Sequence, residues 1–97
     1  MRLAAHEVDA IMRTVRACLG EGARVMLFGS RARDDGRGGD VDLYVESPSP
    51  VPLMDELRLA DTLQRVLDLP VDLVLAAPDL PEQPIHRIAQ ATGVRLG

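Results

Sequence analysis

The sequence has no lysine, no tryptophan and only one cysteine, and these shortages exclude several kinds of protein. A Walker-type phosphate loop and a Schiff-base site both require a lysine, so the chain has neither. Cys18 can form no internal disulfide and no cysteine-based zinc site. We interpret it as a structural residue, because no histidine or lysine near it in the sequence would activate its thiol. Any phosphate bound by this chain is therefore held by backbone N–H groups, serine, arginine or a metal ion.

Aromatic residues, positive charge and long apolar runs are also scarce. Phe28 and Tyr44 are the only aromatic residues and the net charge is −4, which argues against base stacking and against binding to a nucleic-acid backbone. No apolar run approaches the roughly 20 residues that cross a membrane. Residues 1–7 lack the apolar segment of a signal peptide. We therefore expect a cytoplasmic protein that does not associate with a membrane.

What is present is the composition of a folded chain. The 97 residues are 46% apolar and 27% charged, which predicts one globular domain over residues 1–97. The spacing of apolar residues predicts strands at residues 24–28, 40–46, 71–75 and, briefly, 94–96. It predicts helices at residues 7–19, 53–68 and 84–91, with a short helix opening at residue 30. This order predicts an α/β fold in which helices cover a small mixed β-sheet.

The two histidines and the last predicted helix give finer expectations. In that helix Ile85 and Ile88 should lie on the core side, and His86 should lie at the surface. His6 precedes the first helix, and it is also expected at the surface because no second ligand lies at metal spacing from it.

Two aspartates mark the start of the second strand. The apolar run of residues 25–28 ends at Gly29-Ser30, and Asp40 and Asp42 open the next apolar run. Because successive side chains of a strand alternate between its faces, Asp40 and Asp42 share the face opposite to the core. Carboxylates a few Å apart repel each other unless a cation lies between them, so this pair predicts a metal site.

A third aspartate lies inside the strand predicted at residues 71–75. Asp72 is unusual there, because aspartate is disfavoured in strands and is rarely buried without a partner. It is either a hydrogen-bonded structural residue or a third ligand that converges on Asp40 and Asp42. Gly29-Ser30 leaves two readings as well: an ordinary turn from strand to helix, or a place where the backbone approaches a phosphate closely.

Together these residues carry a resemblance to a known family. Gly29-Ser30, followed by Asp40-Val41-Asp42 and by the later strand residue Asp72, resembles the pattern of the DNA polymerase beta nucleotidyltransferase superfamily. The small size is most similar to the MNT domain, the minimal nucleotidyltransferase. The resemblance covers nearly the whole chain, with departures at Asp34 and Gly39, where many relatives carry glycine and serine.

The resemblance implies a Mg²⁺-dependent nucleotidyltransferase that uses ATP. It implies that Asp40 and Asp42 hold one Mg²⁺ together with the phosphates of the nucleotide. It implies that Asp72 holds a second Mg²⁺ and helps to remove the proton of the attacking hydroxyl. The implied nucleotide-binding residues are Gly29, Ser30, Arg31 and Arg33. Taken alone, the two arginines are equally well explained as solvated surface residues.

The resemblance also implies a partner. Small proteins of this kind resemble the antitoxins of HEPN/MNT toxin–antitoxin pairs, in which AMP is transferred from ATP to a tyrosine of the helical HEPN toxin. We therefore expect a HEPN-domain protein as acceptor. Two alternatives remain: a non-catalytic nucleotide-binding antitoxin that caps a HEPN partner by contact alone, and the nucleotidyltransferase subunit of a two-chain enzyme that modifies a small molecule.

Overall fold

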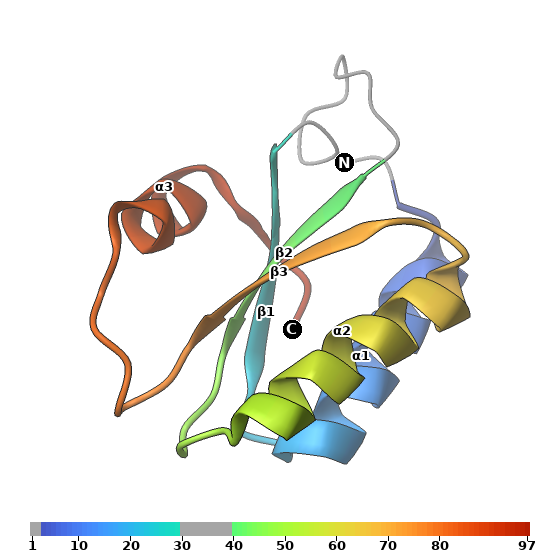
Figure 1. The fold of residues 1–97 in the computed structure, drawn as a ribbon. Helices are drawn as coiled ribbons and strands as arrows, with labels where there is room; N and C mark the ends of the chain where they lie inside the picture. Colours follow the sequence, from blue (N-terminus) through green and yellow to red (C-terminus); the bar gives the residue numbers. More distant parts are fainter. Residues whose placement is uncertain (1–2, 30–39) are drawn as a thin grey trace.

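A four-stranded sheet with helices on both faces forms the body of the protein (Figure 1). The computed structural model describes residues 3–29 and 40–97. The elements of this part are, in order, α1 (Ala5–Leu19), β1 (Arg24–Phe28), β2 (Val41–Glu46), α2 (Leu53–Leu67), β3 (Val71–Ala76), α3 (Pro84–Thr92) and β4 (Val94–Arg95). They agree with the predicted elements to within two residues at each end. The short helix predicted at residue 30 lies outside the described residues.

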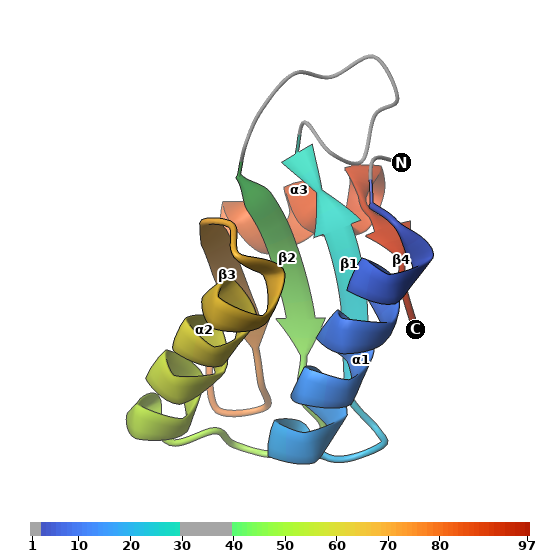
Figure 2. The same cartoon turned by 90° about the vertical axis from the view of Figure 1, so that its right-hand side faces the viewer.

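The sheet is mixed, with the strand order β3-β2-β1-β4. Strand β1 is antiparallel to β2 and to β4, whereas β2 and β3 are parallel because α2 carries the chain back between them. Helices α1 and α2 lie side by side on one face of the sheet, and α3 lies on the other (Figures 1 and 2). The predicted α/β fold, a small mixed sheet covered by helices, is confirmed.

The main core fills the space between the sheet and the two longer helices. Alternation along β2, one of the two inner strands, turns Val41, Leu43 and Val45 into this core, where all three are fully buried. Helices α1 and α2 supply the other side of the core with residues at helical spacing, among them Ile11 and Leu63. The opposite face of β2 is thereby left to Asp42 and Tyr44, and it points toward α3.

A second, smaller cluster lies under α3. It consists of Phe28, Tyr44 and Ala89, with Ile85 packed against it. His86 is only 6% exposed, so the prediction that it lies at the surface is wrong. The backbone N–H of Gln83 donates to Nδ1 of His86 (3.1 Å), and the imidazole ring lies 5.7 Å from the Tyr44 ring. The ring therefore closes the first turn of α3 and fills the space beneath it.

The prediction for Ile88 is also wrong. Ile85 packs against the sheet as expected, but the side chain of Ile88 is 53% exposed. The buried stripe of α3 is centred between His86 and Ala89, and at about 100° per residue Ile88 lies more than a quarter turn outside it. An apolar side chain is thus left at the rim of the helix.

Helix α1 ends at Gly20 as predicted, and Cys18, two residues earlier, is largely exposed. Gly20 ends α1 with φ +92°, and its N–H donates to the carbonyl of Arg16. The thiol of Cys18 lies 3.9 Å from the backbone oxygen of Asp55. Partial burial, together with the negative charge of Asp55, raises the pKa of the Cys18 thiol and keeps it protonated. Within the described residues, no helix is both long enough and apolar enough to cross a membrane.

Candidate functional site

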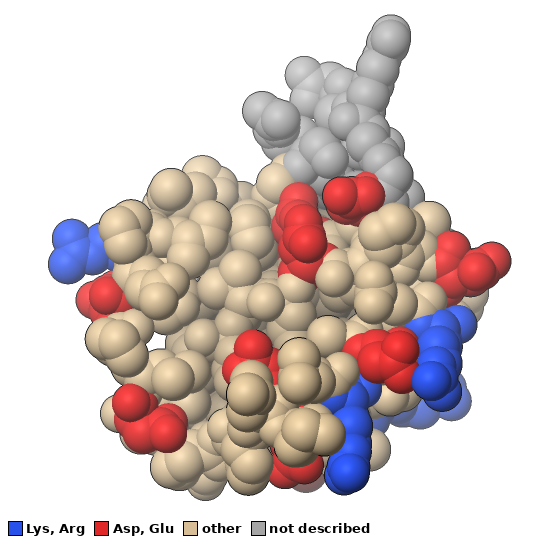
Figure 3. All heavy atoms as spheres, viewed as in Figure 1, with Lys and Arg blue, Asp and Glu red and all other residues tan. Residues whose placement is uncertain are grey.

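The predicted aspartates gather at one end of the sheet, where strand termini meet. Because β1 is antiparallel to β2 while β2 is parallel to β3, the end of β1 and the starts of β2 and β3 meet there. The register places Phe28 of β1 opposite Asp42 of β2, and Asp42 opposite Asp72 of β3. Acidic side chains are visible at this end of the sheet in Figure 3. The chain topology thus brings together two carboxylates that lie thirty residues apart in the sequence.

The carboxyl groups of Asp42 and Asp72 are close enough to share a proton in a hydrogen bond. Asp42 is half-buried, whereas Asp40 and Asp72 are exposed. Burial raises the pKa of Asp42 above its ordinary value, and the hydrogen bond with Asp72 and the charges of Asp72 and Asp40 raise it further. Asp40 therefore lies near enough to act on Asp42 by its charge. Without a bound cation, the state in which all three carboxyl groups are ionised is therefore disfavoured.

Gly29 ends β1 directly against Asp42. Its φ of +73° is in the left-handed region, where the backbone of a residue with a side chain is strained. A Cβ atom added at this position would overlap Oδ2 of Asp42. Glycine is required here for two separate reasons, the backbone conformation and the space taken by the carboxylate. Gly29 and the carboxyl group of Asp42 are therefore packed tightly against each other.

Some of the predicted site residues lie together in the structure, whereas others fall outside the residues that it describes. Gly29, Asp42 and Asp72 form one group, with Asp40 beside it; Ser30, Arg31 and Arg33 lie outside the described residues. Over residues 3–29 and 40–97, no three Asp, Glu, His or Cys side chains form a ready-made cage for a metal ion. Two adjacent carboxylates nevertheless fit Mg²⁺, which binds few protein oxygens and completes its shell with phosphate oxygens and water.

A cleft beside this group was missed in the sequence. It has a volume of about 370 Å³ and is lined by Phe28, Gly29, Ile88 and Thr92, from the tip of β1 and from α3. Its walls lie about sixty residues apart in the chain, and the sequence gives no local pattern that joins them. The one available signal is Ile88, an apolar residue that falls outside the stripe of its own helix.

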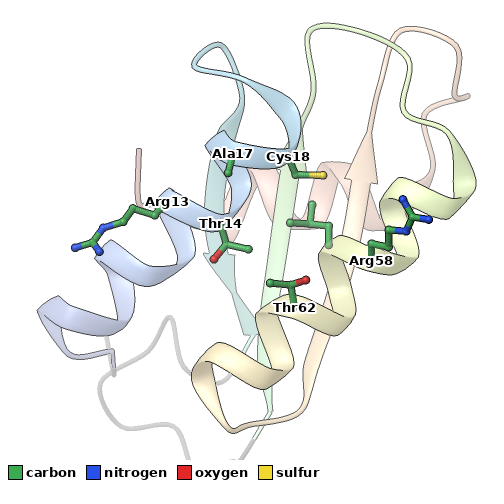
Figure 4. A pocket seen from close by; sticks show the side chains of 7 residues that line it. Arg13, Thr14, Ala17, Cys18, Arg58 and Thr62 are labelled. Atoms are coloured by element: carbon green, nitrogen blue, oxygen red, sulfur yellow. The ribbon is translucent and has the colours of Figure 1, made fainter.

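A second hollow lies on the other side of the molecule, between α1 and α2 (Figure 4). In this groove of about 470 Å³, Thr14 and Cys18 of α1 face Thr62 of α2, while Arg13 and Arg58 point outward at its two ends. It lies in the helix layer, on the face of the sheet opposite to Asp42. The groove is therefore not part of the carboxylate site.

Comparison with known proteins identifies the class of this chain. Residues 8–95 match the family model described as nucleotidyltransferase domain. The chain belongs to this family, and it is a nucleotidyltransferase. No curated protein matches it.

Solved structures of HEPN/MNT toxin–antitoxin complexes show the same fold. One is the tri-AMPylated Shewanella oneidensis HEPN toxin in complex with MNT antitoxin (TM-score 0.72, 20% identity, covering 95% of this chain and 70% of the other). A toxin–antitoxin structure with AMP-PNP gives a TM-score of 0.74 at 20% identity, covering 93% and 72% of the two chains. A MntA–HepT toxin–antitoxin structure gives 0.72 at 18% identity, covering 97% and 72%. The predicted resemblance is thus confirmed for the family, and for the MNT group it is confirmed as a likeness of fold.

Replacing Gly29 by alanine should cost more stability than the same change at Gly20. Both residues have positive φ, but a Cβ at Gly20 meets no atom within 4 Å, whereas one at Gly29 overlaps the Asp42 carboxylate. We expect G29A to lower the free energy of unfolding by about 1–3 kcal/mol more than G20A, measured by urea denaturation. In the double variant G29A/D42A the added Cβ meets only ordinary contacts, so this extra loss should disappear. An equal loss in G29A and G20A would show that the close packing does not exist.

The raised pKa of Asp42 predicts how stability depends on pH in cation-free buffer. A group whose pKa is raised by folding stabilises the native state below its ordinary pKa and loses that contribution as pH rises through the raised value. D42N should therefore gain stability relative to the wild type as pH rises from about 4. At neutral pH we expect a gain of about 0.5–1 kcal/mol, the size of interactions between partly exposed charges. D9N, an exposed site on α1, is the control; identical pH profiles for wild type and D42N would contradict the prediction.

Proposed function

We propose that the chain is a Mg²⁺-dependent nucleotidyltransferase that transfers AMP from ATP to a hydroxyl of a HEPN-type partner protein in the cytoplasm, and so acts as an antitoxin. The observation that carries the proposal is the pair Asp42 and Asp72, which lie side by side at the end of the sheet where Gly29 ends β1. The chain that holds this pair belongs to the nucleotidyltransferase family. Structural neighbours that hold AMP-PNP or an AMPylated HEPN toxin support the choice of nucleotide and acceptor.

The donor set is suited to magnesium. Asp40 and Asp42 would hold one ion together with the nucleotide's phosphates, and Asp72 would hold a second ion. When bound, Mg²⁺ would neutralise phosphate charge and activate the attacking hydroxyl. The burial and neighbouring charges that disfavour an ionised Asp42 are the conditions under which a cation binds with most benefit. Ser30, Arg31 and Arg33 are proposed as further contacts of the phosphates.

The chain's own residues divide the transfer between them. Gly29, without a side chain, lets the phosphates approach the backbone beside Asp42. The acceptor oxygen forms a bond to the α-phosphorus of ATP, the bond from that phosphorus to the bridging oxygen breaks, and pyrophosphate leaves with the electron pair. Asp72, exposed on β3, accepts the hydroxyl proton and releases it to solvent. Asp72 thus serves the acceptor, and Asp40 with Asp42 serves the nucleotide.

The variant D72N separates an enzyme from a binding module. The amide keeps the shape of Asp72 but removes the charge that accepts the proton, so we expect MgATP binding within about tenfold of wild type. Transfer of AMP to a HEPN-domain protein, followed by mass spectrometry, should fall about a hundredfold or more. The control is D68N, because Asp68 is an exposed residue in the left-handed conformation that asparagine also adopts.

Three results of this experiment would change the proposal. If D72N inhibits the HEPN toxin fully while transferring nothing, the chain caps its partner by contact alone. If D72N changes only the melting temperature and transfers normally, Asp72 is a structural residue. If wild type modifies a small molecule but never the HEPN protein, the chain is the nucleotidyltransferase subunit of a two-chain enzyme.

Removal of the metal should abolish most nucleotide binding. We expect wild type to bind ATP with Mg²⁺ in the micromolar to millimolar range, about −8 to −4 kcal/mol, by titration calorimetry. EDTA should weaken this binding strongly, and so should D40N or D42N, because each removes a proposed ligand of the cation that carries the phosphates. D79N, a change in an exposed loop, should bind as wild type does. ATP binding that is unaffected by EDTA and by both substitutions would exclude the proposed metal site.

A further inference from the structure

Strand β3 is the outermost strand on one side of the sheet, and the backbone on its outer side is open. The carbonyls of Pro70 and Ala76 accept bonds from N–H groups of β2. Because backbone groups point alternately to the two sides of a strand, the N–H and C=O groups of Leu73 and Leu75 point away from β2. Within residues 3–29 and 40–97, these groups pair with no other backbone or side-chain group.

A groove of about 330 Å³ runs along this open edge. It is lined by residues 73–75 of β3, by Glu56 of α2 and, on the other side, by Ile85 and His86 of α3. Helices α2 and α3 cover opposite faces of the sheet (Figure 1). The groove, which we call the edge groove, therefore lies across the edge of β3 and not on one face of the sheet.

Apolar side chains of α2 continue the wall of the edge groove. The N–H of Val71 donates to Oε1 of Gln64 (3.4 Å), so the side of α2 that carries Gln64 faces the open edge. Leu57 and Leu53 precede Gln64 by about two and three helical turns, and they therefore lie on the same side of α2. They are 53% and 67% exposed, and Leu80 in the lining of the groove is exposed as well. Apolar surface is thus left uncovered beside unpaired backbone groups.

The charge around the edge groove is negative. Glu56 lies half-buried in its wall, and Asp72 is exposed at the start of β3. None of the described residues that line the groove is an arginine. In Figure 3, which is viewed with β3 in front of the other strands, acidic side chains are spread over this face, and basic ones lie at its left margin and its lower right. An occupant with a basic side chain would complement this charge.

We propose that the edge groove binds an extended segment of the HEPN-type partner, which adds to β3 as a further strand. Glu56 pairs with a basic side chain of this segment, and Leu57 packs against an apolar one. The inference rests on the proposed function, from which it takes the partner. An added strand bonds the open N–H and C=O groups of Leu73 and Leu75. A helix docked here would bury the same groups without partners, which costs free energy.

Charge also distinguishes this segment from a second copy of the chain. If two copies paired through β3 about a two-fold axis, one edge groove would face the other, and both Glu56 side chains would meet in the joined groove. Like charges repel each other there, and neither groove supplies an arginine from its lining. A different protein that carries a basic side chain fits the edge groove better.

Strand addition would also position the acceptor. Asp72 directly precedes Leu73, and its carboxyl group lies on the face where it meets Asp42. Side chains of neighbouring residues on adjacent strands lie about 5 Å apart. A segment paired with Leu73 therefore has one side chain beside Asp72, at the place where the proposed reaction needs a hydroxyl. The register of the added strand, and not an enclosing pocket, would bring this hydroxyl to the site.

Hydrogen exchange tests strand addition directly. The amide protons of Leu73 and Leu75 in the full chain are followed by NMR, with and without a HEPN-domain protein. Exchange at both positions should slow about tenfold or more in the complex, because each N–H gains a bonded partner. The N–H of Val74 points toward β2 and is the internal control, which should be protected in both states.

Substitutions in the wall of the edge groove test the contacts. By titration calorimetry, E56K and L57D should each raise the Kd of the complex with the HEPN-domain protein about tenfold or more. D9K makes the same charge reversal at an exposed site on α1. V66D places an acid on α2 at a residue that is 49% exposed, on a different side of the helix from Gln64. Both controls should bind as wild type does, and the Kd of MgATP should stay within about twofold in every variant.

The outcomes separate this inference from the proposed function. A wild-type chain that neither binds nor modifies a HEPN-domain protein would contradict the proposed function, and the inference would fail with it. A complex in which the Leu73 and Leu75 amides still exchange freely would overturn the inference alone. Equal effects of E56K and D9K, or of L57D and V66D, would do the same. Protection of these amides without the HEPN-domain protein, rising with the concentration of the chain, would assign the edge groove to a second copy and overturn the inference.

Discussion

The close approach of the carboxyl groups of Asp42 and Asp72, at a half-buried position, is the constraint on which the candidate site depends. The parallel register of β2 and β3 holds them opposite each other, and the apolar core on the other face of the sheet fixes that register. Because side chains alternate along a strand, burial of Val41 and Leu43 forces Asp42 to the face of α3. A slip of one residue would turn a carboxylate into the core, so the hydrophobic pattern also protects the site.

This arrangement lowers the stability of the native state when no ligand is bound. Half-burial of Asp42 beside two other carboxylates, and the left-handed backbone of Gly29 packed against it, both work against the unliganded native state. Any ligand that binds only the folded form recovers stability by mass action. In the proposed function, the cation and the nucleotide would recover this stability by binding beside Asp42 and Gly29, the residues that lower it.

The sequence was informative where one local rule decided the outcome. Helical and strand periodicity placed the elements within two residues, and alternation on β2 separated Asp42 from the core. Convergence of Asp72 on Asp42 required the order of the strands, which the family pattern supplied. The faces of α3 were missed, because a short helix with apolar residues at several angles is oriented by what it packs against; His86 is buried and Ile88 exposed for that reason. The cleft depends on that orientation and was missed with it.

In the proposed function, the position of Asp72 on β3 has a consequence for the size of the acceptor. Among the described strands β3 lies at the margin of the sheet, and Asp72 is exposed there. A carboxylate at the bottom of an enclosed cavity admits only small molecules or chain ends. A carboxylate on the margin of a sheet can be approached sideways by a convex surface, so a hydroxyl on another folded protein can reach it without either partner unfolding. Access of this kind sets no upper limit on acceptor size, and selectivity must then come from surfaces outside the catalytic group.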